Sequence, residues 1–305
     1  MSDFEIKKAT RQGVIPLIGL YGESGCGKTM SALLLARGLV GPSGDIHMID
    51  TESRRGSLYA DVIPGGYSVL DLNSPFTPQR FIAALQAVID AGAKIVALDS
   101  ASMEWDGMGA VLDMAAENEA KSGRAGLHNW KTPKFEHAKF IQFLLRSPIP
   151  VILCLRAKHK TKQTKENGKT VIVKEDFTSP IQDEAFTFEM TAHAEILQDH
   201  SIHLTKCSHP ELQKCFPATG PLKIEHGALI AQWCAAGGAR KPETTRSAKQ
   251  RLWKLTESIH GGKPEKLEAH LRKLEFLQPD QALGSLSEEQ LAAICTVIEK
   301  DKTLT

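Results

Sequence analysis

A glycine-rich segment near the amino terminus constrains the fold of this chain more than any other feature. It has the pattern Gly-x4-Gly-Lys-Thr, with an apolar run at 14–21 before it and helically spaced leucines at 30–39 after it. Such a loop turns backbone N–H groups inward around a phosphate at the amino end of a helix. The segment therefore predicts a strand, a loop and a helix. It also predicts a nucleoside triphosphate site, most simply for MgATP, formed by Gly22, Glu23, Ser24, Gly25, Cys26, Gly27, Lys28, Thr29 and Met30.

Four side chains are candidates for phosphate and metal chemistry. Lys28 is expected to contact the β- and γ-phosphate oxygens as a catalytic cation, and the Thr29 hydroxyl is expected to complete the Mg²⁺ shell. Asp99 ends the apolar run 94–99 and is placed to bind the metal through water. The alternative for Asp99 is a strand-terminal cap. Ser100 could orient the γ-phosphate or cap a helix.

Short apolar runs alternate with helical patterns along the first half of the chain. The runs 46–50, 67–72, 94–99 and 150–155 are candidate strands, and 78–91, 107–121 and 133–145 are candidate helices. The runs are apolar throughout rather than at every second residue, which is typical of a parallel sheet covered on both faces. The sequence thus predicts an α/β fold with a mainly parallel sheet.

The carboxyl-terminal part differs in composition. The segment 237–246 is small, polar and broken by a proline, so it is expected to be a linker between a domain at 1–236 and a tail at 247–305. Helical patterns at 247–259, 264–274 and 287–300 predict a small helical domain, with a capping box at Ser287 and Gln290. We expect this domain to bind a partner or nucleic acid.

A basic hairpin is predicted between these regions. The turn signal at 166–169 follows a lysine-rich, β-branched stretch, and from 156 to 174 there are seven lysines and arginines against one acid. Flexible lysines with few aromatic neighbours suit phosphate contacts without base reading. The alternative is a solvated hairpin. The candidate DNA-binding residues are Arg156, Lys158, Lys160, Lys162 and Lys165.

Two of the predicted strands of the first half, 46–50 and 94–99, resemble strands of RecA-type recombinase ATPases. The segment 46–53 reads IHMIDTES and is similar to their second strand, and 96–100 reads VALDS and is similar to their Walker B strand. The resemblance implies a RecA-like fold in which Glu52 is the catalytic general base that activates the attacking water. The alternative is a surface Glu52 paired with Arg54 or Arg55. The loops after the fourth and fifth strands face DNA in that family, which is where the basic hairpin falls.

Phage and prophage ATP-binding proteins with a RecA-like, AAA-type domain are a closer match, over about residues 14–235. The matching residues are Trp105, Trp130, the Ser147-Pro148 pair and the run Arg156-Ala157-Lys158. This resemblance implies an ATPase that acts on single-stranded DNA in recombination, annealing or replication. It also implies a homo-oligomer that works with recombination or replication proteins.

Composition sets limits on the location and partners of the chain. The formal net charge is +1, so any attraction to DNA must be local. The chain has no apolar stretch of membrane-spanning length and no signal-peptide core, and one of its six cysteines lies in the phosphate loop. We therefore expect reduced thiols and a location in the cytoplasm, that of the host if the gene is viral. His200, His203, Cys207, His209 and Cys215 lie close together in the sequence, but they lack the paired-cysteine spacing of a zinc site, so we do not expect zinc there.

Two other functions fit the phosphate loop. A small-molecule or nucleotide kinase would need a lid of arginines, and Arg54, Arg55, Arg124 and Arg156 are not evidently spaced as one. An ATP-gated interaction protein would need no hydrolysis and would leave Glu52 inert.

Overall fold

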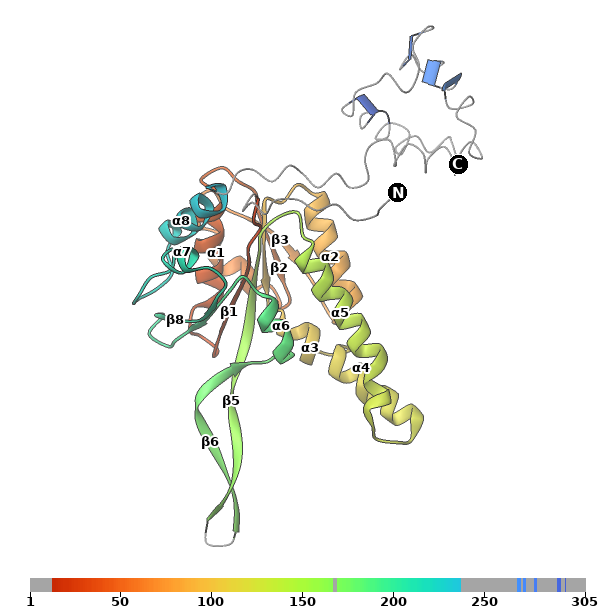
Figure 1. Cartoon of the computed structure of the whole chain (residues 1–305), viewed down its shortest axis with the longest axis vertical. Coiled ribbons are helices and arrows are strands. Elements are labelled where there is room, and N and C mark those ends of the chain that lie inside the picture. Colours follow the sequence, from red (N-terminus) through yellow and green to blue (C-terminus); the bar gives the residue numbers. More distant parts are fainter. Residues whose placement is uncertain are drawn as a thin grey trace. The chain divides into compact units, whose positions relative to one another are not determined.

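The computed structural model describes residues 13–166 and 169–236, together with 268–269, 271–272, 277–278, 290–291 and 294 (Figure 1). Contacts divide the chain into two compact units, Met1–Ala239 and Arg240–Thr305. The predicted linker and nearly all of the predicted tail helices, Ser287 included, lie outside the described residues. The domain boundaries and the role of the tail therefore stay predictions.

An eight-stranded sheet forms the centre of the first unit. Its order is β3-β2-β4-β5-β1-β7-β8, with β6 paired to β5. All pairs are parallel except β5 with β6 and β7 with β8. The strands are β1 (Leu17–Gly22), β2 (Ile46–Asp50), β3 (Ser68–Asp71), β4 (Ile95–Asp99), β5 (Val151–Glu166), β6 (Lys169–Pro180), β7 (Ala192–Ile196) and β8 (Ile202–Cys207). The predicted α/β fold with a mainly parallel sheet is confirmed.

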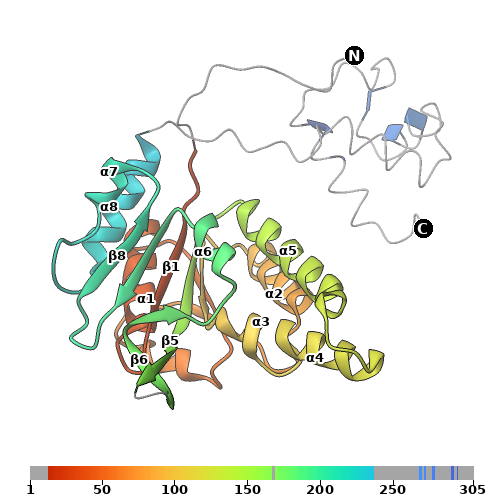
Figure 2. The same cartoon turned by 60° about the horizontal axis from the view of Figure 1, so that its bottom comes forward.

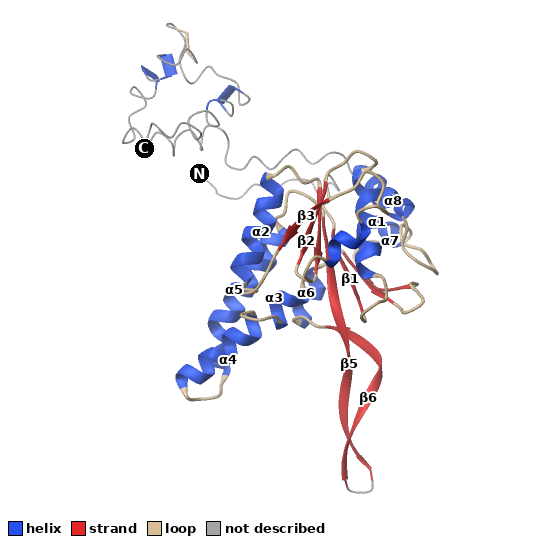
Figure 3. Ribbon diagram, turned by 180° about the vertical axis from the view of Figure 1, so that it is seen from behind, coloured by secondary structure: helices blue, strands red, loops and turns tan. Residues whose placement is uncertain are grey.

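Helices cover both faces of the sheet (Figures 1 and 3). One face carries α1 (Lys28–Val40), α7 (Pro210–Gln213) and α8 (Ile224–Ala235), and the other carries α2 (Pro78–Asp90), α4 (Val111–Ser122) and α5 (Lys131–Leu145). Shorter elements are η1 (Arg55–Tyr59), α3 (Ser102–Asp106), η2 (Leu127–Trp130) and α6 (Glu184–Glu189). Alternate residues of β1 belong to opposite core clusters, Ile18 and Leu20 to one and Leu17 and Tyr21 to the other. This explains why the strand sequence is apolar throughout.

The packing of α8 on α1 depends on two glycines. A Cβ atom on Gly38 would lie 2.0 Å from the carbonyl oxygen of Ile224, and one on Gly227 would lie 2.2 Å from that of Leu35. The two backbones therefore touch directly at this crossing. Helix α8 was not among the predicted helices, although it completes one face of the core.

Two predicted boundaries were wrong in ways that concern function. The helix expected at 107–121 begins only at Val111, and the chain before it forms the separate helix α3. Gly109 separates them with a φ of 77°, a conformation that does not continue a helix. The strand expected at 150–155 does not end there but continues as β5 to Glu166, so core strand and hairpin are one element.

The hairpin projects away from the rest of the unit in Figures 1 and 3, and Figure 2 views it nearly along its length. Ala157–Pro180 is the first backbone pair and Glu166–Lys169 the last, so the two strands pair up to the ends of the turn segment 166–169 that the sequence predicted. The turn residues 167 and 168 lie outside the described part. None of the helices described here has the length and apolar composition needed to cross a bilayer.

Candidate nucleotide-binding and hydrolysis site

The phosphate loop joins the end of β1 to the start of α1. Gly25 and Gly27 have φ angles of 84° and 91°, which L-residues with side chains rarely adopt. A Cβ atom on Gly22 would lie 2.4 Å from the carbonyl oxygen of Ile196, so the first glycine is also required by close packing. The Lys28 ammonium donates a hydrogen bond of 2.7 Å to the Glu23 carbonyl. In this conformation the lysine lies over its own loop, where a phosphate would meet it.

Thr29 and Asp99, which are distant in sequence, meet at the predicted metal position. Strand β5 lies between β1 and β4, and the Thr29 hydroxyl reaches across to donate to Asp99 Oδ2 at 2.5 Å. Burial raises the pKa of Asp99 to about 6, and the hydrogen bond from Thr29 opposes that rise. A hydroxyl and a carboxylate that already converge are the hard oxygen ligands that Mg²⁺ prefers, so these residues fit the ion. Capping by Asp99 is not what the structure shows.

The loop after β2 is shaped by Asp50. Its buried carboxylate accepts hydrogen bonds from the backbone N–H of Glu52 at 2.6 Å and of Gly56 at 2.8 Å. The backbone N–H of Thr51 donates to the carbonyl of Asp99 at 2.8 Å, which ties this loop to the end of β4. Together these bonds place Glu52 beside the phosphate loop and Asp99.

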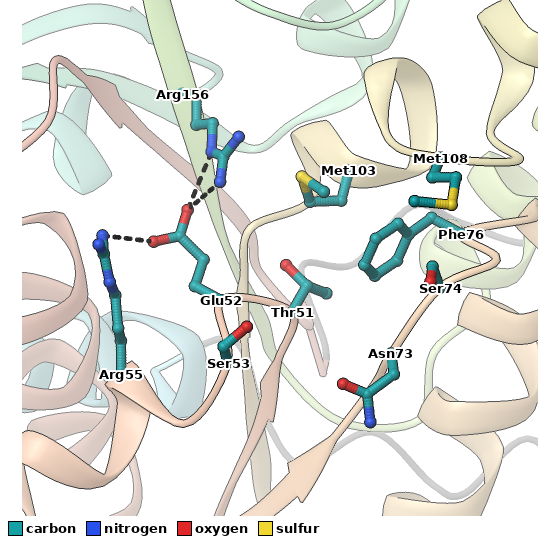
Figure 4. A pocket seen from close by; sticks show the side chains of 10 residues that line it. All are labelled: Thr51, Glu52, Ser53, Arg55, Asn73, Ser74, Phe76, Met103, Met108 and Arg156. Carbon is teal, nitrogen blue, oxygen red and sulfur yellow. Dashed lines mark hydrogen bonds and ion pairs between the residues drawn. The ribbon is translucent and has the colours of Figure 1, made fainter.

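Glu52 is held by two arginines. Its Oε1 accepts from Arg156 Nε at 2.9 Å and lies 2.8 Å from Arg156 Nη2, while its Oε2 lies 3.6 Å from Arg55 Nη1 (Figure 4). The charge of Glu52 acts on Asp99 and contributes to the raised pKa of that group. The pairing with Arg55 that the sequence suggested is present, whereas Arg54 pairs with Asp71 at 3.5 Å. The partnership with Arg156 was not predicted.

A pocket of about 500 Å³ opens beside Glu52. Figure 4 shows polar side chains on the Glu52 side and an apolar wall opposite. The lining residues are Thr51, Glu52, Ser53, Arg55, Asn73, Ser74, Phe76, Met103, Met108 and Arg156. A water or a small acceptor in this pocket would be adjacent to the candidate base.

Arg156 has a contact that the sequence did not predict. It was grouped with the hairpin lysines as a DNA contact, but the structure turns its guanidinium to Glu52. The side chain of Lys158 is exposed. Lys160, Lys162 and Lys165 lie along β5 at positions whose side chains are outside the described part.

Three residues whose role the sequence did not predict contact the phosphate loop. The Glu23 carboxylate is 3.2 Å from His159 Nε2 at the root of the hairpin and accepts from Gln198 at 3.2 Å. His200 Nδ1 is 2.9 Å from the carbonyl oxygen of Cys26. All three come from distant segments, and no local pattern marks them.

The structure also places three further candidate residues of the phosphate site, Cys26, Met30 and Ser100. The Cys26 side chain is fully buried in a core cluster, so only the backbone of this residue is available to the phosphate site. Met30 packs against the same cluster. Ser100 is buried and donates to the Cys154 carbonyl at 3.2 Å, so it does not face the phosphate site. Among the described residues no three His, Cys, Asp or Glu side chains cluster as metal ligands.

These features define the class of the protein. A phosphate loop with an acidic strand end two strands away, on a mainly parallel sheet covered by helices, is a P-loop ATPase domain of RecA-like fold. Residues 16–203 match the model of the AAA domain family, so the chain belongs to that family.

Other comparisons add little to this assignment. A solved ATPase from the type III secretion system of pathogenic bacteria is similar at 15% identity and a TM-score of 0.37, with 96% of this chain and 88% of that one covered. The curated proteins contain no significant match.

Proposed function

We propose that this chain hydrolyses MgATP and that the reaction is stimulated by single-stranded DNA bound along the basic hairpin. The observation that carries the hydrolysis is the convergence of Lys28, Thr29 and Asp99 at one sheet edge, with Glu52 beside them. Phage-type recombination, annealing or replication, in an oligomer, is the setting that the family resemblance favours.

Each protein group has one task in the proposed reaction. Lys28 leaves the Glu23 carbonyl and contacts the phosphate oxygens. Thr29 and Asp99 would hold Mg²⁺, and the ion would supply positive charge to offset that of the phosphates. Glu52 accepts the proton of the attacking water, which requires that its fork with Arg156 opens.

The same fork suggests how DNA could act on hydrolysis. Arg156 is the residue at which β5 leaves the core sheet, because its neighbour Ala157 begins the pairing with β6. A DNA strand bound to the hairpin would thus contact the segment that carries Arg156, the residue whose positive charge is paired with the Glu52 carboxylate. Release of Glu52 from Arg156 would convert an idle site into an active one.

A kinase is the second candidate, favoured by one observation. The structure brings Arg55 and Arg156 together beside a pocket that contains Asn73 and Ser74, although their sequence spacing gave no sign of it. A phosphate acceptor could occupy this pocket in place of water.

The test is phosphate release from ATP, measured with and without a single-stranded oligonucleotide, for the parent and Lys28→Ala. We expect turnover in the parent that rises with DNA, and none in Lys28→Ala. An equal rate of turnover in the parent with and without DNA would refute the proposed stimulation by DNA. ADP formation that needs an added small-molecule acceptor would favour the kinase, and binding without turnover would favour an ATP-gated interaction protein.

A further inference from the structure

A second pocket lies at the root of the hairpin, outside the phosphate site. It has a volume of about 430 Å³ and is lined by Trp105, Leu127, Trp130, Lys131, Lys134 and Asp183. The indole rings of Trp105 and Trp130 have centroids 6.3 Å apart and are tilted by 33°. Both tryptophans are partly exposed, and the Leu127 side chain at the rim is 90% exposed. An aromatic and apolar surface of this kind is costly to leave in water.

The rim of this pocket is cationic. Lys131 and Lys134 are one helical turn apart at the start of α5, both are exposed, and neither pairs with an acid among the described residues. Asp183 is already engaged, since its carboxylate accepts from the backbone N–H of Ala185 as the cap of α6. The two lysines are therefore available to a ligand that carries negative charge next to flat apolar groups.

Trp105, which packs against Trp130, is itself packed against a buried polar pair, His137 and Glu104. The ring centroids of His137 and Trp105 are 5.1 Å apart. The Nδ1 atom of His137 lies 3.0 Å from each carboxylate oxygen of the fully buried Glu104. Gln182 donates to the Ala101 carbonyl at 3.2 Å. Because its support is packed and hydrogen-bonded, the aromatic surface is preformed.

The walls of the pocket are joined to both strands of the hairpin. The returning strand β6 ends at Pro180, three residues before Asp183 on the pocket wall. The outgoing strand leaves the sheet at Arg156, whose backbone N–H donates to the Ser102 hydroxyl in α3 at 2.9 Å, and Trp105 belongs to the same short helix. A polyanion lying along the hairpin would thus reach the pocket at its base.

From these observations we infer that the pocket of Trp105 and Trp130 stacks bases of a single strand of nucleic acid, with Lys131 and Lys134 on its phosphates. Stacking on aromatic side chains is tolerant of sequence, because every base has a flat π-face. This inference rests on the proposed function, because it assumes that the hairpin binds the same strand. It adds a contact to the bases that lysines alone do not make.

The test compares a labelled oligothymidylate with an abasic strand of the same length, which keeps the phosphates but lacks bases. The parent is expected to bind the oligothymidylate more tightly, and Trp130→Ala to lose about 5- to 100-fold in affinity for it with little change for the abasic strand. Leu127→Ala is expected to act in the same direction, and its exposed site carries no risk to folding. The double variant Phe135→Ala/Lys139→Ala, on the same helix but outside the pocket, is the matched control and is expected to bind like the parent.

A second readout uses the tryptophans themselves. The chain has four, so Trp233→Phe/Trp253→Phe leaves only the two pocket indoles as emitters. Their fluorescence is expected to be quenched by the oligothymidylate and not by the abasic strand. Equal binding of both strands without quenching would overturn the pocket inference and leave the hairpin proposal standing. No binding of either strand at low salt would instead refute the DNA part of the proposed function, and the pocket inference with it.

Discussion

Three carboxylates lie together at the end of β2 and β4, and each is stabilised differently. Asp50 accepts two backbone N–H groups, Glu52 is paired with two arginines, and Asp99 has a hydroxyl donor and little else to offset its burial. The pKa of Asp99 is accordingly raised to about 6. A buried carboxylate with so little compensation is strained until a cation arrives.

This predicts a trade between stability and function at Asp99. The folded pKa lies above the ordinary value of 3.8, so Asp99 lowers stability progressively as pH rises through the window from about 4 to 6. Asp99→Asn keeps an acceptor for Thr29 without the charge. Without nucleotide it should be more stable than the parent at pH 7 by up to about 3 kcal/mol, with the difference vanishing near pH 4.

Urea unfolding of both proteins at several pH values measures this difference, because groups common to both cancel. The variant should also lose Mg²⁺-dependent hydrolysis. A difference in stability that stays constant across the pH range would contradict the assignment of the raised pKa to Asp99.

A second residue-scale prediction concerns Glu52. Glu52→Gln should slow hydrolysis by about a hundredfold or more while MgATP affinity stays the same, since the amide cannot accept the proton of water. Single-turnover hydrolysis and nucleotide titration separate the two effects. Glu117→Gln removes an exposed carboxylate of α4 that pairs with Lys121 at 3.4 Å, and serves as the control. If Glu52→Gln hydrolyses ATP like the parent, the base is elsewhere.

At the scale of elements, the sequence predicted those features that depend on residues adjacent in the chain. The phosphate loop, Asp99 at a strand end and the hairpin turn each follow from a few adjacent positions. The partnership of Arg156 with Glu52, and those of His159 and Gln198 with Glu23, join segments more than a hundred residues apart. Such pairs depend on strand order, which periodicity does not encode. Helix α8 was missed because its apolar residues are weakly patterned, and glycine packing rather than a wide apolar face joins it to α1.

The hairpin itself yields a prediction about salt. If Lys158, Lys160, Lys162 and Lys165 contact phosphates, their joint replacement by Ala should make the slope of log affinity against log salt shallower by roughly 0.7 per lost contact on single strands. Basal hydrolysis should survive, because none of the four lies at the phosphate site. Fluorescence anisotropy at several salt concentrations measures the slope.

The matched control replaces four exposed lysines elsewhere, namely Lys94, Lys121, Lys214 and Lys223. It changes the net charge equally, so it separates local contacts from the overall field of the protein. Equal slopes for the parent and the hairpin variant would remove the hairpin from DNA binding.

At the scale of the whole molecule, the two core clusters of the described residues both lie within the first compact unit. Both core clusters consist of residues between Leu17 and Cys234, and the first compact unit ends at Ala239. A fragment of residues 1–236 should therefore fold and bind MgATP with the affinity of the full chain. Thermal unfolding and nucleotide titration of the fragment check this. Its aggregation would mean that the tail completes the core.

The continuity of β5 has a mechanical consequence. At 3.3–3.4 Å per residue, the part of β5 from Ala157 to Glu166 is an arm about 30 Å long. Its core part is bonded to β1 on one side and β4 on the other, the two strands that carry the phosphate loop and Asp99. A pull on the arm along its axis loads both sets of hydrogen bonds in shear, so they resist together instead of opening one by one. The core end of the arm lies between the two strands that carry the two halves of the phosphate site. A force applied along the arm at its tip is therefore transmitted to both halves at once.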